Sequence, residues 1–102
     1  MAKLIAIYKQ PKDPQAFDDY YFGTHVPLAN TVPGLLGNEV SKGPVVTPQG
    51  PSPYHRVAIL SFESMAALQQ GLASPEGRAT AADLANFADA GVELLVFDTQ
   101  NV

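Results

Sequence analysis

The stretch Leu4-Ile5-Ala6-Ile7-Tyr8-Lys9-Gln10-Pro11-Lys12-Asp13-Pro14 decides how the chain begins to fold. Its β-branched and aromatic run, residues 4–8, is typical of a strand, and Gln10-Pro11 ends that strand. Both faces of this strand are apolar, so other parts of the structure should cover both. Asp13 followed by Pro14 then predicts the start of a helix, with Asp13 as its N-cap.

Two helical regions are predicted. The first carries aromatic residues at helical spacing from Phe17 to Tyr21. Glycine and proline within it indicate that it kinks or restarts near Thr24, which could cap a second short segment. The second region begins at Ser64 and is interrupted at Ser74, where a Ser-Pro pair repeats the start signal.

Three further strands are predicted, at residues 35–41, 57–62 and 92–97. The first of them contains glycine and asparagine and is expected at an edge of the sheet. Residues 43–53 hold four prolines and two glycines and are expected to form only a loop, either mobile or lying over a neighbouring subunit. The order β-α-β-β-α-β predicts one ferredoxin-like α+β domain over residues 1–102, with a four-stranded antiparallel sheet and helices on one face.

The composition excludes several classes of function. Ten acidic and six scattered basic residues give a net charge of −4, so nucleic acid and membrane are not expected as partners. The absence of cysteine excludes disulfides, zinc–thiolate sites and thiol nucleophiles. The apolar run at the N-terminus is too short for a signal peptide or a membrane span, and the expected location is the cytoplasm.

The helix-free face of the predicted sheet needs a partner. The strands at residues 4–8, 57–62 and 92–97 carry apolar residues in both phases of the strand alternation. Helices cover only one face, so the apolar residues of the other face would meet water. We therefore expect a homodimer through the helix-free sheet face, whose two sheets enclose apolar space.

The motif F-x-x-Y-Y-x-x-x-H-x-P-L at residues 17–28, followed by Pro33-Gly34-Leu35, resembles the EthD family. The segments Ser74-Pro75-Glu76-Gly77 and Asp83-Leu84-Ala85-Asn86-Phe87-Ala88 are also similar to that family. The resemblance implies a dimeric α+β barrel. It also implies relatives that isomerise, cyclise or decarboxylate lactone-like or polyketide-like molecules with no metal or redox cofactor, beside a namesake linked to ether degradation.

His25 is the main catalytic candidate, expected to face the space between helices and sheet with one ring nitrogen accessible. An imidazole can take a proton from a carbon or hydroxyl acid near neutral pH and return it elsewhere. Alternatively, His25 fixes the kink before Pro27 by bonding backbone groups. Tyr21 shares the helical face of His25, whereas Tyr20 is turned aside. Each phenol is a candidate for orienting a carbonyl or stabilising an enolate, or else is a core aromatic residue.

His55 and Arg56 are weaker candidates for ligand binding. They are adjacent on a predicted strand, so they are expected to face opposite sides of the sheet, near solvent. Asp18-Asp19 lie in the first turns of a helix and are interpreted as structural, serving the helix dipole and solvent. Two histidines and no carboxylate cluster at ligand spacing predict no metal site.

Three functions fit these patterns. The first is binding of a small, largely apolar organic molecule in a catabolic pathway of the ether or xenobiotic type, either directly or as an auxiliary protein of that pathway. The alternative is a cofactor-free isomerase, cyclase or decarboxylase with His25 as acid and base. A haem-degrading or quinol-type monooxygenase is disfavoured, because there is no tryptophan and no convincing haem-ligand setting.

Overall fold

The computed structural model describes all residues, 1–102. A four-stranded antiparallel sheet has the strand order β2-β5-β1-β6, which places β2 at one edge, as predicted, and β6 at the other. The strands are β1 (Ala2–Lys9), β2 (Leu35–Val40), β5 (Tyr54–Phe62) and β6 (Val92–Asp98). The ferredoxin-like α+β architecture is therefore confirmed.

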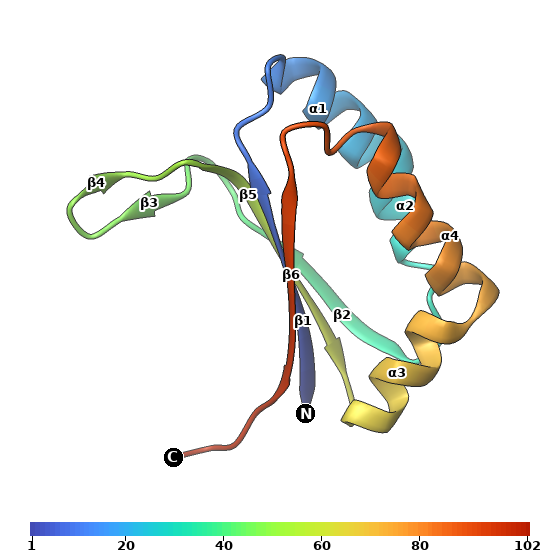
Figure 1. Ribbon diagram of the computed structural model, residues 1–102. Helices are drawn as coiled ribbons and strands as arrows, with labels where there is room; N and C mark the ends of the chain where they lie inside the picture. Colours follow the sequence, from blue (N-terminus) through green and yellow to red (C-terminus); the bar gives the residue numbers. More distant parts are fainter.

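All helices lie on one face of this sheet (Figure 1). They are α1 (Pro14–Tyr20), α2 (Val26–Ala29), α3 (Met65–Ala73) and α4 (Pro75–Asp83), with a 3-10 turn, η2, at Leu84–Asn86. The predicted caps are confirmed: Asp13 accepts a hydrogen bond from the backbone of Ala16, and Ser74 accepts one from Gly77. None of the helices is long and apolar enough to cross a membrane.

The predicted interruption of the first helical region is a π-helical turn, η1, at Tyr21–His25. Because the backbone stays helical through His25 and into α2, no new N-terminus is created there. The prediction that Thr24 caps a second segment is therefore wrong, since α2 begins without a side-chain cap. The π turn keeps Tyr21 and His25 on one side, with their ring centroids 5.7 Å apart.

The segment after β2 departs from the sequence-based expectation. Two short strands, β3 (Val46–Thr47) and β4 (Gly50–Pro51), pair as a hairpin, so the prediction of a loop without ladder pairing is wrong. Pro51 is accommodated because an edge position needs no N–H, and the Thr47 hydroxyl donates to the Gly50 carbonyl oxygen across the turn. This hairpin arm extends on the side of the sheet away from the helices (Figure 1).

The core lies between the helices and one face of the sheet. Strand alternation directs Leu4, Ala6 and Tyr8 of β1 toward the helices, where each is buried. On the opposite face the side chains of Ile5 and its neighbours are only partly buried. Strand β6 is apolar on both faces and remains half-exposed, as at Leu95, which is 52% exposed.

Candidate functional site

A cavity of about 150 Å³ lies between the helices and the sheet. Thirteen of its 17 lining residues are hydrophobic. The sheet contributes Leu4, Ala6, Ala58, Leu60 and Leu94, and the helices contribute Val26, Ala29, Leu72, Ala81 and Leu84. Among the few side chains with polar atoms at this cavity are Tyr8, Tyr21, His25 and Asn38. An apolar hollow with a few polar groups is the usual form of a small-molecule site.

His25 is 5% exposed and is fixed by a carboxylate at the end of α4. Its Nδ1 lies 2.9 Å from Oδ2 of Asp83. The other oxygen of Asp83 accepts hydrogen bonds from the Tyr20 hydroxyl at 2.5 Å and from the Asn86 amide at 2.9 Å. Three donors from three separate segments therefore hold this carboxylate, and it orients the imidazole in turn.

The charge state of Asp83 sets the tautomer of His25. Burial raises the pKa of this carboxyl group, but hydrogen bonds from Tyr20, Asn86 and His25 outweigh burial and leave the pKa below its usual value. An ionised carboxylate only accepts hydrogen bonds, so Nδ1 of His25 carries the proton. In the neutral form of the ring the lone pair is therefore on Nε2, which bonds no protein group, while the residue lines the cavity.

The phenols around His25 divide into two roles. Burial raises the pKa of Tyr21 to about 12, and burial is also the main reason that the pKa of Tyr8 lies above its usual value. Both stay protonated at neutral pH and can donate a hydrogen bond into the cavity. Tyr20 does not line the cavity, in agreement with its being turned aside, but its bond to Asp83 raises its pKa and ties it to the same network.

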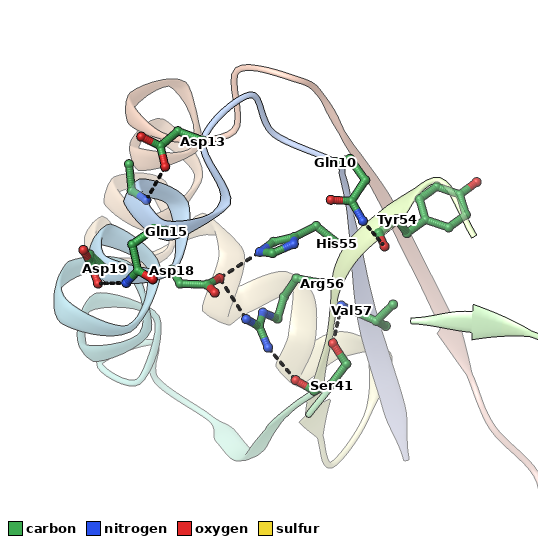
Figure 2. Close-up of polar contacts among 11 residues, drawn as sticks. Gln10, Asp13, Gln15, Asp18, Asp19, Ser41, Tyr54, His55, Arg56 and Val57 are labelled. Carbon is green, nitrogen blue, oxygen red and sulfur yellow. Dashed lines mark hydrogen bonds and ion pairs between the residues drawn. The ribbon is translucent and has the colours of Figure 1, made fainter. Parts of the chain in front are cut away.

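His55 and Arg56 do not face opposite sides of the sheet, so that prediction is wrong. Both donate toward Oδ1 of Asp18, from His55 Nε2 at 2.8 Å and from Arg56 at 2.9 Å (Figure 2). The strand pairing shifts register between Tyr8 and Lys9 opposite this point, and such a bulge lets neighbouring side chains turn to one side. Arg56, expected near solvent, is 8% exposed.

Asp18 is thus more than a solvent-facing residue of the first helix. Burial raises its pKa, but hydrogen bonds from His55 and Arg56 outweigh burial and lower the pKa below its usual value. Arg56 also donates to the Ser41 carbonyl oxygen at 2.6 Å and lies over the ring of Phe22 at 4.8 Å. This cluster joins α1 to β5 outside the cavity, beside a separate hollow near the hairpin arm.

A family model described as the EthD domain matches residues 9–91. The chain belongs to the EthD family. The resemblance inferred from the motif at residues 17–28 is therefore confirmed. No group of three or more histidine, cysteine, aspartate or glutamate side chains in this family member could hold a metal ion.

Two relatives cover nearly all of this EthD chain. An uncharacterized 11.0 kDa protein of the thcB–thcC intergenic region of Rhodococcus erythropolis is 41% identical over 102 residues, which are 100% of this chain and 98% of the relative. An EthD family protein from Bacillus halodurans is 37% identical with a TM-score of 0.89, covering 98% of this chain and 99% of that one.

The fold extends to more distant proteins. SnoaB, a cofactor-independent oxygenase from Streptomyces nogalater, has a TM-score of 0.68 at 16% identity, covering 99% of this chain and 94% of that one. At 16% identity this likeness shows only that the EthD chain and SnoaB share a fold.

His25, Tyr20 and Tyr21 were predicted from the sequence of this EthD chain, but Asp83, which bonds His25 and Tyr20, was not. A usable signal exists, because Asp83 is the only charged residue between Arg78 and Asp89 in an alanine-rich segment. A single carboxylate on a helix that packs against a sheet must find donors.

Proposed function

We propose that this EthD protein binds a small, largely apolar organic molecule in the cavity between its helices and sheet, in a catabolic pathway of the ether or xenobiotic type. The observation that supports this proposal is the cavity itself, whose lining is mainly apolar with a few polar side chains. A cavity of about 150 Å³ is comparable to one that accepts benzene, so the expected ligand has on the order of six to ten non-hydrogen atoms.

The His25–Asp83 pair favours a second candidate, a cofactor-free isomerase, cyclase or decarboxylase. In this reaction Nε2 of His25 would take a proton from the bound molecule and return it at another position. Asp83 would hold the Nδ1 proton and stabilise the imidazolium that forms. The protonated Tyr21, stacked on His25, would donate to an oxygen that becomes negative.

The proposed working form is a homodimer through the helix-free face. Apolar side chains in the outer strand β6 support this proposal: Leu95 is 52% exposed and Phe97 is 42% exposed. Leu94 on the same strand lines the cavity while remaining 50% exposed. A second copy against β6 would therefore also shield one side of the binding site.

Native mass spectrometry of freshly purified protein tests binding and subunit count together. We expect a dimer that retains a small organic molecule. The variant Ala81→Phe, whose larger side chain fills the cavity, should lose that molecule. A wild-type protein whose cavity takes up no apolar probe, such as 1-octanol at millimolar concentration in a titration followed by NMR, would refute the binding proposal.

The variants His25→Asn and His25→Gln separate binding from catalysis. Asparagine keeps a donor near the position of Nδ1 toward Asp83 and removes Nε2, whereas glutamine can reach the cavity but cannot take up a proton. Under the catalytic candidate both variants lose turnover, and the glutamine variant, whose amide still reaches the cavity, retains the bound molecule. Turnover retained in both variants would leave only the binding function.

A further inference from the structure

Asn38 presents an unusual polar group to the cavity. It lies on β2 opposite Leu60, whose side chain is buried on the helix side of the sheet, so Asn38 faces the same way. Its Nδ2 donates to Oδ1 of Asn30, just after α2, at 3.0 Å. Its own Oδ1 is fully buried and has no hydrogen-bond partner. Asn38 also lines the cavity.

An unpaired buried amide oxygen is costly, and native structures rarely keep one without a reason. No protein donor reaches Oδ1 of Asn38, whereas the amide nitrogen is already held by Asn30. The acceptor capacity of this oxygen therefore remains unused in a residue that lines the cavity.

Thr80 also lines the cavity, but its hydroxyl donates to the Glu76 carbonyl oxygen. The other polar side chains of the cavity lie at two separate places. Tyr8 and Tyr21 pack with ring centroids 5.4 Å apart, and His25 stacks on Tyr21. Tyr8 pairs with Arg56, whereas Asn38 is at the level of Leu60, four residues along β5. Four residues of strand correspond to about 13 Å along the strand direction between the backbone positions of Tyr8 and Asn38. The cavity-lining residues Ala6 and Ala58 pair with each other between these two positions.

From this arrangement we infer that the ligand is two-ended: it carries a hydroxyl at Asn38 and a second polar group at His25, with an apolar body between them. This inference rests on the proposed binding function and specifies its substrate class. The oxygen and nitrogen of the Asn38 amide can exchange places if the Asn30 amide turns with it. A ligand hydroxyl fits both arrangements, because it can donate a hydrogen bond to the oxygen or accept one from the nitrogen.

Two eight-carbon probes test the inference, 1-octanol and 1,8-octanediol. The terminal oxygens of the diol span roughly 10 Å when extended, from bond lengths near 1.5 Å. NMR titrations of the wild-type protein should show the diol binding about fivefold more tightly than 1-octanol, the gain expected for one hydrogen bond. The variant Asn38→Leu should reverse this preference. Asn30→Ala, which keeps the cavity oxygen, should retain it.

A thermal melt of the free Asn38→Leu protein adds a readout that does not need a ligand. Replacing the unpaired amide by leucine should leave Tm unchanged or raise it, whereas a purely structural Asn38 would make the variant melt lower. If Asn38→Leu does not fold, Asn38→Ala provides the same comparison. Binding of 1-octanol with no diol preference in the wild type would overturn this inference alone. Binding of neither probe would overturn the proposed function as well.

Discussion

His25 depends on Asp83 for its orientation, and Asp83 depends on donors that come from three parts of the chain. The imidazole is buried against Phe87 with ring centroids 4.6 Å apart, so it has little freedom to rotate. One ring nitrogen is bonded and the other is free. This is the arrangement required of a positioned base, and it is also compatible with a hydrogen-bonding ligand group.

Replacing Asp83 with asparagine should destabilise the protein in a pH-dependent way. The folded-state pKa of Asp83 lies below its usual value, so its stabilising effect is complete above about pH 4 and is lost as the pH falls through the folded pKa. At pH 7 Asp83→Asn should lower the free energy of unfolding by roughly 1–3 kcal/mol.

Urea denaturation between pH 2.5 and 7 measures this effect. The difference between wild type and Asp83→Asn should narrow below about pH 4. A difference that stays constant over the whole range would mean that the carboxylate charge contributes nothing to the network.

The catalytic candidates were accessible from sequence because His25 and Tyr21 belong to one local motif with helical spacing. The lone charge of Asp83 is visible in the sequence, but its pairing with His25 is not, since that contact spans 58 residues and depends on how α4 packs. The Asp18–His55–Arg56 cluster was missed for a different reason. Period-2 alternation assumes a regular strand, and the register shift opposite Tyr8–Lys9 breaks that assumption.

At the scale of elements, the close packing of α3 against α4 depends on a glycine. A Cβ atom built on Gly77 would lie 2.2 Å from the carbonyl oxygen of Gly71 and 2.6 Å from that of Leu72, both backbone atoms that cannot move aside. Gly77 therefore fixes how closely α4 approaches the end of α3, and with it the position of Asp83.

The variant Gly77→Ala should lower stability by about 1–3 kcal/mol because it overpacks this contact. The matched control is Gly23→Ala in η1, where nothing lies within 4 Å of the new Cβ. That substitution should raise stability by roughly 0.5–1 kcal/mol, as alanine does in helices. Calorimetry of both variants measures these two changes in stability. Equal changes of the same sign would show that the contact between α3 and α4 at Gly77 does not determine the stability of the protein.

Most strands and helices were predictable because their caps and apolar runs are local signals. The hairpin arm was not, because four prolines in residues 43–53 outweighed the β-propensity of the short run Val45-Val46-Thr47. Side chains hold the arm together, as at Ser52, whose hydroxyl donates to the Val45 carbonyl oxygen at 2.5 Å.

Replacing residues 45–52 by a short glycine linker should cost little stability, since the arm extends away from the core (Figure 1). Chemical denaturation together with light scattering checks this prediction. Loss of folding on deletion would instead make the arm an integral part of the dimer.

At the scale of the whole molecule, two copies of the chain are expected to cover each other's helix-free faces. Light scattering at micromolar concentration should give a dimer mass. Leu95→Glu places a charge among the apolar residues of that face and should yield monomers, whereas Glu76→Gln on α4 should not. A monomeric wild-type protein would remove the proposed interface.

We propose that His25 presents a free Nε2 to a ligand in the cavity, and ¹⁵N NMR of the histidine rings measures the state of this nitrogen. The chain has two histidines, so His55 serves as an internal reference. At pH 8.5, His25 should show a protonated Nδ1 and an unprotonated Nε2, and 1-octanol should shift the Nε2 resonance of His25 while leaving His55 unchanged. A proton on Nε2, or a His25 ring that does not respond to saturating 1-octanol, would contradict the account.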